Sequence, residues 1–189
     1  VETMTELIEY YKGIFTILSS CASRQLEEVT FRRTVIPVQE LLDAAGKYFK
    51  KLMKNRPERI ELEIEPMEAK VIGDVNQLRF LLENLIDEAL TVREDGVIRL
   101  QARKDNEYIR FLFTDTRREK SVEELNQLFY PNLARMTSGE KGELRGTEYL
   151  VCKQIIRDHD EFAGRRGCRI NAEPAEGGGF TVYFTIPRR

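Results

Sequence analysis

Residues 73–90 of the chain read GDVNQLRFLLENLIDEAL, and this stretch decides the fold. Its apolar residues recur every three or four positions and form one broad stripe: Leu78, Leu81, Leu82, Leu85, Ile86 and Ala89. That spacing predicts an amphipathic helix, running from Asp74 to about Thr91, that buries one face. Asp74 stands at the N-cap position, and Gln77 three residues later predicts a capping box at the same end.

Strand and helix signals alternate on both sides of this helix. The segment Ile60–Glu65 alternates strictly between apolar and charged residues, which is typical of a strand with one buried face. We expect strands at 34–38, 60–65, 69–72, 97–102, 108–114, 168–173 and 180–186, helices at 39–53, 121–129 and 146–159, and a long mobile loop at 130–145. Paired strands with helices grouped between them predict an α+β fold, a two-layer α/β sandwich with helices on one face of a mixed sheet.

Residues 1–28 carry a helical pattern of their own. Met4, Leu7, Tyr11, Ile14, Leu18 and Cys21 step by threes and fours, as in a heptad seam. An apolar stripe of this width needs a partner. Two interpretations stay open: the helix packs back on its own domain, or it is half of a helical hairpin that dimerises. Because the pattern is already helical at Val1, we expect the chain to be part of a longer protein.

Composition narrows the functional classes. Thirty Lys and Arg against 32 Asp and Glu give a formal net charge of −2, so charge favours neither nucleic acid nor a membrane surface as a partner. No apolar run approaches the roughly 20 residues of a membrane-spanning helix. Three widely spaced cysteines are expected to be reduced thiols, and a single histidine gives little support to a zinc site.

The order and spacing of five motifs resemble the catalytic domain of sensor histidine kinases, a branch of the superfamily shared with DNA gyrase, Hsp90 and MutL. The helix at 73–90 is similar to the helix that carries two asparagines one turn apart in that family. Asn84 stands at the first asparagine position and Glu88 at the second, while Thr91 stands where a lysine is usual. Side chains at i and i+4 share one face of a helix and can hold Mg²⁺ together.

Three further motifs follow in family order. Asp115 matches an aspartate that accepts a hydrogen bond from the adenine amino group, but Arg117 replaces the glycine two residues later. Gly146 matches the first of two glycines that open a phosphate-binding helix, and Glu148 replaces the second. Leu128-Phe129-Tyr130-Pro131 resembles the start of the lid over the nucleotide.

The resemblance extends to both ends of the chain. Residues 167–187 are similar to the family's final hairpin, and residues 1–28 to the second helix of its dimerisation hairpin. It therefore implies two domains, the C-terminal part of that hairpin at 1–28 and an ATP-binding domain of the histidine-kinase-like ATPase fold at 29–189. It also implies a cytoplasmic domain, with attachment of the parent protein to a membrane as a family expectation.

One function implied by the resemblance is that of a histidine kinase. The domain would bind ATP with Mg²⁺ and transfer the γ-phosphoryl group to a histidine outside this chain, since His159 lies on the wrong helix and is expected to pack or cap. Asn84 and Glu88 would hold the metal, Asp115 would bind adenine, and Gly146 would approach phosphate, with lid cations that neutralise its charge: Arg135, Lys141 and Arg145. Implied partners are the dimerisation hairpin, a response regulator and a second copy through residues 1–28.

A second function follows from the replaced residues. Arg117 and Glu148 each put a long side chain where the family pattern has a hydrogen atom, and they could pair across an empty site. The domain would then be a pseudokinase-like signalling module that does not bind ATP. A third class is a structural dimerisation domain built on the first helix, which would lose partner recognition when residues 1–28 are deleted.

Overall fold

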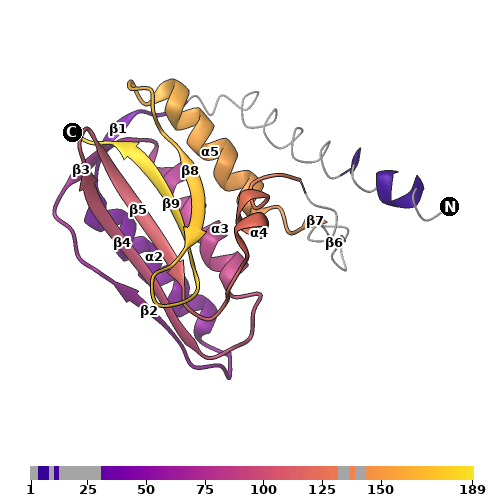
Figure 1. Ribbon diagram of the computed structural model, residues 1–189. Helices are drawn as coiled ribbons and strands as arrows, with labels where there is room; N and C mark the ends of the chain where they lie inside the picture. The colour runs from indigo at the N-terminus through magenta and orange to yellow at the C-terminus, as the bar shows by residue number, and fades with distance from the viewer. Residues whose placement is uncertain (1–3, 9–10, 13–30, 132–136, 139–143) are drawn as a thin grey trace.

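A computed structural model describes residues 4–8, 11–12, 31–131, 137–138 and 144–189 (Figure 1). The expected order of elements is confirmed within these residues. The strands are β1 (Thr34–Pro37), β2 (Ile60–Ile64), β3 (Lys70–Gly73), β4 (Gly96–Asp105), β5 (Tyr108–Asp115), β6 (Thr137–Ser138), β7 (Leu144–Arg145), β8 (Ile170–Pro174) and β9 (Phe180–Pro187). The helices are α2 (Val38–Met53), α3 (Val75–Ala89), α4 (Val122–Asn126) and α5 (Glu148–Phe162).

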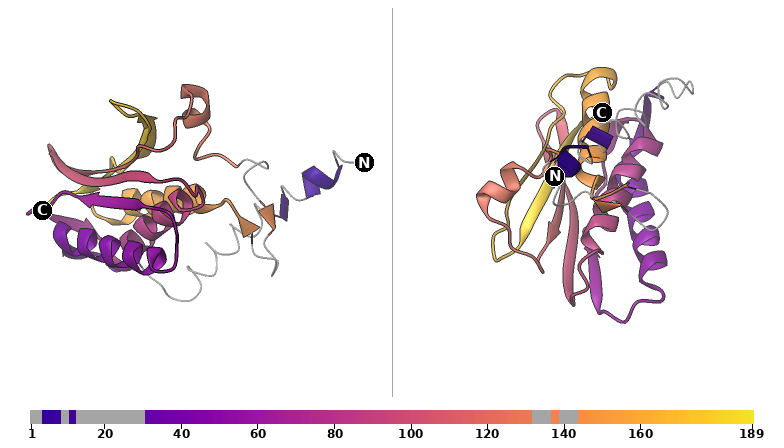
Figure 2. Two further views of the ribbon diagram at one scale, coloured as in Figure 1. Left: turned by 90° about the horizontal axis from the view of Figure 1, so that it is seen from below. Right: turned by 90° about the vertical axis from the view of Figure 1, so that its right-hand side faces the viewer.

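The main sheet has five strands in the order β2-β4-β5-β9-β8. Strand β2 runs parallel to β4, whereas β4, β5, β9 and β8 pair in antiparallel fashion, so the sheet is mixed as predicted. Strands β1 and β3 form a separate two-stranded sheet. Helices α2, α3 and α5 lie together on one face of the main sheet (Figures 1 and 2). The expected two-layer sandwich is therefore the observed fold.

The core lies between this sheet and the three helices. The predicted stripe of α3 is buried along its whole length: Leu78, Leu81, Leu82, Leu85, Ile86 and Ala89. From the sheet, Phe111 of β5 and Phe184 of β9 stack with ring centroids 4.8 Å apart. Because the helix stripe repeats every 3.6 residues and the strands alternate, both layers turn apolar side chains toward the same space.

Two local predictions are wrong. The capping box of α3 is only half formed, because Asp74 accepts from the amides of Asn76 and Gln77 but Gln77 Oε1 has no hydrogen bond. In a capping box, the side chain of Gln77 would accept a hydrogen bond from the backbone amide of Asp74. That amide donates to His159 Nε2 instead. The loop expected at 130–145 contains a short hairpin, β6 with β7. Its strands are two residues long, too short to leave a periodic signal.

The first helix and the cysteines are described in part. Residues 4–8 and 11–12 are helical, and Met4, Leu7, Ile8 and Tyr11 are exposed there. The rest of the predicted helix, including Cys21, lies outside the described residues, so the domain boundary at residue 28 stays a prediction. Cys152 and Cys168 are buried free thiols, as expected. Within the described part, no helix has the length and apolar character to span a membrane.

Candidate functional site

Asp115 lies at the end of β5, buried to 1% exposure. Its Oδ1 accepts hydrogen bonds from the backbone amide and from Nε of Arg117, both at 3.0 Å. Its Oδ2 accepts from Nη2 of Arg117 and from Nε of Arg118, again at 3.0 Å. A carboxylate offers about four lone-pair positions, so the acceptor capacity of Asp115 is filled by its two neighbours.

The guanidinium of Arg117 is equally saturated. Besides Asp115, its Nη1 donates to the carbonyls of Val92 and Glu94 at 2.9 Å, and its Nη2 donates to Ala89 O at 2.6 Å. An arginine has five N–H donors, and each one therefore has an acceptor. Its side chain is 1% exposed. We call these acceptors, the Asp115 carboxylate and the carbonyls of Ala89, Val92 and Glu94, the Arg117 pocket.

Gly96 makes room for this arginine. It begins β4 with a φ of +146°, and a Cβ placed there would lie 2.5 Å from Arg117 Cγ. A side chain at position 96 would therefore collide with the aliphatic stem of Arg117. The segment between α3 and β4 thus supplies carbonyl groups that bind the guanidinium of Arg117, and it supplies Gly96, which leaves room for the stem of that side chain.

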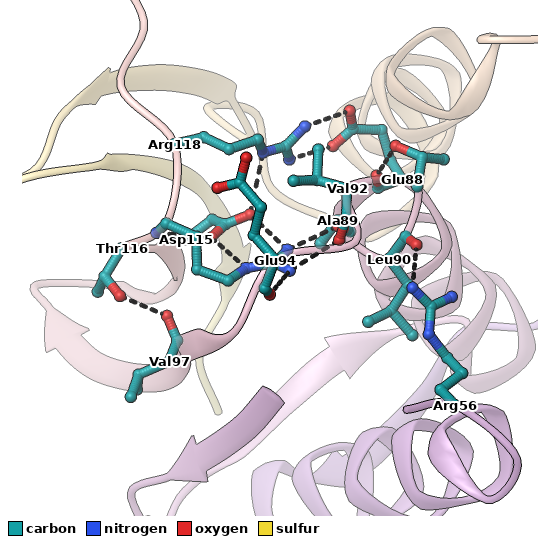
Figure 3. Close-up of polar contacts among 12 residues, drawn as sticks. Arg56, Glu88, Ala89, Leu90, Val92, Glu94, Val97, Asp115, Thr116 and Arg118 are labelled. Carbon is teal, nitrogen blue, oxygen red and sulfur yellow. Dashed lines mark hydrogen bonds and ion pairs between the residues drawn. The ribbon is translucent and has the colours of Figure 1, made fainter. Parts of the chain in front are cut away.

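Arg118 connects this network to helix α3 (Figure 3). It makes a two-point contact with Glu88 of α3, at 3.0 Å from Nη1 to Oε1 and 2.8 Å from Nη2 to Oε2. Burial alone would lower the pKa of Arg118, but its hydrogen bond to Glu88 and the charge of that carboxylate outweigh burial and raise it. The ion pair is mostly buried, with side chains 14% and 17% exposed. Arg118 thus joins Asp115 to Glu88.

Tyr149 completes the network from α5. Its hydroxyl donates to Glu88 Oε2 at 2.5 Å. Burial raises the pKa of Tyr149 well above its ordinary value, and the charge of Glu88 adds to the effect. The ring of Phe129 meets Tyr149 edge-on, with centroids 5.7 Å apart. The segment expected to begin the lid is therefore packed against the same residue that contacts Glu88.

The two predicted metal ligands face different partners. Asn84 is 8% exposed, and its amide nitrogen donates to the carbonyl of Phe80 one turn earlier at 2.8 Å. Both carboxylate oxygens of Glu88 accept from Arg118. Thr91, at the family's lysine position, donates to Glu88 O. Among the described residues, no three His, Cys, Asp or Glu side chains gather in a group suited to a metal ion.

The other predicted residues are placed only in part. Gly146 precedes α5 with a φ of +83°, and Glu148 lies in the first turn of that helix, where a carboxylate favours the dipole. The suggested pair between Arg117 and Glu148 is wrong, because the five donors of Arg117 bind other groups. Arg135 and Lys141 lie outside the described residues, and Arg145 is described only as backbone of β7.

His159 is the packing and capping residue that was expected. It is fully buried in α5, its Nε2 accepts from the Asp74 amide at 3.1 Å, and its Nδ1 lies 2.8 Å from Ile155 O. These partners assign a neutral ring that donates through Nδ1. Burial lowers the pKa of His159 to about 4, although the bond to Ile155 O and the charge of Asp74 act in the opposite direction.

Sequence reasoning missed Arg118, Tyr149 and Gly96 as parts of this site. Arg118 follows Arg117 directly, so a pair of arginines after the aspartate was a visible signal. Tyr149 follows Glu148 in the expected phosphate-binding helix, but nothing in that local pattern pairs it with Glu88. Gly96 follows Asp95 in a dipeptide typical of turns, and that pattern gives no sign of the contact with Arg117.

Comparison with known proteins places this geometry in context. Residues 73–189, more than half of the chain, match the family described as histidine kinase-, DNA gyrase B- and HSP90-like ATPases. The catalytic domain of histidine kinase ThkA is 21% identical, with a TM-score of 0.64 over 83% of this chain and 98% of that chain. The Acinetobacter baumannii histidine kinase AdeS is 14% identical, with a TM-score of 0.65 over 98% of this chain and 82% of that chain.

A third similar structure is histidine kinase ThkA in complex with the response regulator protein TrrA. It is 19% identical, with a TM-score of 0.64 over all of this chain and 52% of that chain. No curated protein matches the chain in sequence. At such identities the solved structures establish likeness of fold.

Proposed function

The chain belongs to the family of histidine kinase-, DNA gyrase B- and HSP90-like ATPases, and we propose that it is a pseudokinase-like signalling domain in which Arg117 takes the place of the nucleotide base. The observation that carries the proposal is the saturated contact between Arg117 and Asp115. Asp115 is the residue that would bind adenine, and its oxygens are already occupied.

ATP does not fit the residues as they stand. To reach Asp115, adenine would have to displace a guanidinium whose five donors all have acceptors, and its amino group would return few of those bonds. The carbonyls of Ala89, Val92 and Glu94 would lose their donor. Breaking a buried ion pair costs about 3–5 kcal/mol, which lowers affinity by a factor of roughly 150 to 4,000. Micromolar binding would become millimolar.

Mg²⁺ fits no better. Glu88 would have to leave both Arg118 and Tyr149 to coordinate a cation, and Asn84 would have to leave the Phe80 carbonyl. Arg118 also brings a positive charge to within hydrogen-bonding distance of the proposed metal ligand, and that charge opposes a dication. We therefore derive no phosphoryl-transfer step for this domain.

The proposed role is interaction within a two-component signalling protein. The solved complex of ThkA with TrrA concerns another kinase, and it motivates a response regulator as the partner to test here. Residues 1–28 are proposed as the second helix of a dimerisation hairpin, on the strength of their heptad seam. In this arrangement the domain would transmit a conformational state to its partners without catalysis.

The alternative is an ATP-dependent kinase with weakened binding. Asn84 and Asp115 favour it, because both keep the residue type that the family uses. The two functions differ in one measurable quantity, the affinity of the unmodified chain for nucleotide.

Calorimetric titration of the whole chain with ATP, and with a non-hydrolysable analogue, in Mg²⁺ tests the proposal. We expect no binding tighter than millimolar. The restored variant Glu88→Asn, Arg117→Gly, Glu148→Gly is expected to gain affinity, provided that circular dichroism shows it folded.

The matched control adds Asp115→Asn to the restored variant and should abolish the gain, which assigns binding to this pocket. Micromolar binding by the unmodified chain, lost on Asp115→Asn alone, would overturn the proposal.

A further inference from the structure

A second site lies at the other end of β5. The β4–β5 register pairs Ile98 with Asp115 at one end and Asp105 with Tyr108 at the other. The eight residues of β5, from Tyr108 to Asp115, span about 23 Å at the rise of a strand. Near the Tyr108 end, a cleft of about 440 Å³ is lined by Arg33, Val35, Ile72, Gly164, Arg165 and Arg188. We call it the arginine cleft.

The arginine cleft brings together three segments that are distant in sequence. Arg33 precedes β1, Arg165 follows α5, and Arg188 follows β9. Arg188 forms an isolated bridge with Val71, and its amide donates to Glu107 O at 2.8 Å, which fixes the end of β9 beside β3. Figure 1 shows the end of the chain in this position, next to β1 and β3.

The cleft carries more positive than negative charge. Glu107 forms an ion pair with Arg165. Within the described part of the chain, the guanidinium groups of Arg33 and Arg188 make no ion pair or hydrogen bond. Three guanidinium groups against one carboxylate leave an excess of two positive charges.

The backbone is shaped to admit one of these groups. Gly164 has a φ of +94°, and a Cβ there would lie 2.7 Å from Arg33 Nη1. Glycine therefore serves both the turn after α5 and the approach of the guanidinium. Val35 and Ile72, paired between β1 and β3, supply an apolar wall. The cleft is thus lined by both guanidinium groups and apolar side chains.

We propose that the arginine cleft binds a phosphoryl group, as inorganic phosphate or as a phosphomonoester. A phosphate dianion matches the excess of two charges, and guanidinium groups contact its oxygens in a two-point geometry. A monocarboxylate has half the charge and is a poorer ligand. The bound anion joins Arg33, which directly precedes β1, to Arg165 and Arg188. This site is independent of the proposed function.

The test is a titration of the full chain followed by ¹H–¹⁵N correlation spectra. The probes are inorganic phosphate, phenyl phosphate and acetate at constant ionic strength. Both phosphates should shift the amides of Gly164, Arg165 and Arg188 saturably, and acetate should not. Equal affinity for the two phosphates would show that the cleft binds the phosphoryl group alone. Tighter binding of phenyl phosphate would show that the apolar wall also contacts the ligand.

Variants assign the binding to the cleft. Arg33→Gln and Arg188→Gln should each weaken phosphate binding about tenfold, the loss of roughly one charge-assisted contact. Arg59→Gln, an exposed arginine at the Asp115 end, is the matched control and should leave affinity unchanged. Equal weakening by all three variants, equal shifts with acetate, or no saturable shift would overturn the proposal. If ATP binds in the arginine cleft, the amide signals of Gly164, Arg165 and Arg188 will shift, and these shifts distinguish it from ATP bound at Asp115.

Discussion

The two ends of β5 both carry arginines, and the arginines differ in the acceptors around them. At the Asp115 end, Arg117 has an acceptor for each of its five donors and is 1% exposed. At the Tyr108 end, Arg33 is exposed, and among the described residues Glu107 forms its ion pair with Arg165 and not with Arg33 or Arg188. A saturated guanidinium is a structural element, whereas an unsaturated one is available to a ligand.

One fold therefore holds a site whose polar groups are paired with each other and a cleft whose polar groups are accessible. The Asp115 end, which the proposed function treats as the nucleotide end, is filled by the side chains of Arg117 and Arg118. The opposite end retains space and charge. Four measurements can break or sharpen the contrast.

The largest expected effect is at the Arg117 pocket. Arg117→Met removes donors from Asp115 and from three carbonyls, so the free energy of unfolding should fall by about 3–5 kcal/mol in urea denaturation. The double variant Arg117→Met, Asp115→Leu should recover much of the loss, because no buried charge is then left unpaired. Arg103→Met, at an exposed position on β4, is the control and should change stability by less than about 0.5 kcal/mol. A loss below about 1 kcal/mol for Arg117→Met would contradict a structural role.

The next effect depends on pH and concerns His159. Its pKa is about 4 in the folded chain, against about 6.5 when unfolded. Between these values the unfolded state binds a proton that the folded state does not, so stability falls as pH drops from about 6.5 to about 4 and is unaffected by this group above 6.5. The full contribution is about 3 kcal/mol. The chain has one histidine, so its single imidazole resonance in NMR should titrate near pH 4. A midpoint near 6.5 would refute the assignment.

A smaller effect is expected at Tyr149. Tyr149→Phe removes one hydrogen bond to the Glu88 carboxylate and keeps the ring contact with Phe129, so the free energy of unfolding should fall by about 1.5–2 kcal/mol. Tyr183→Phe is the matched control, since its hydroxyl makes no hydrogen bond within the described residues. If both variants are equally stable, the hydroxyl of Tyr149 does not hold Glu88.

The smallest effect is predicted for the arginine cleft. Arg33→Gln should change the free energy of unfolding by less than about 0.5 kcal/mol, because this exposed guanidinium has no hydrogen-bond acceptor among the residues that the structure describes. Calorimetric unfolding with and without phosphate measures both quantities, since a ligand raises the melting temperature only of a chain that binds it. If Arg33→Gln lowered the free energy of unfolding as much as Arg117→Met, the arginines at the two ends of β5 would not differ in their role.

Most of the fold could be predicted because it rests on periodic patterns. The alternation at Ile60–Glu65 and the stripe of α3 each identified an element and its buried face. The far end of β4 was missed, since Arg103 to Asp105 are polar and belong to the strand only through pairing with β5. The wrong capping box has the same cause. The acceptor that competed with Gln77 was His159, 82 residues further along the chain.

The site was predictable only where side chains carry the chemistry. Asp115 and the replacement at position 117 were visible in the sequence, and so was the disagreement of Arg117 with the family pattern. Its acceptors were not, because three of them are backbone carbonyls, and a carbonyl has no sequence signature. The pairing of Arg118 with Glu88 joins residues 30 positions apart, and no local pattern predicts it.

The fit between Gly96 and Arg117 has a consequence for how this chain can change over generations. Position 96 cannot gain a side chain while position 117 is long. A glycine at position 117 would cost several kcal/mol of stability, a large share of the 5–15 kcal/mol that holds an ordinary domain together. If the proposed function is right, a lineage that gained nucleotide binding one substitution at a time would therefore pass through a less stable intermediate. Gly96 and Arg117 therefore constrain each other's substitution.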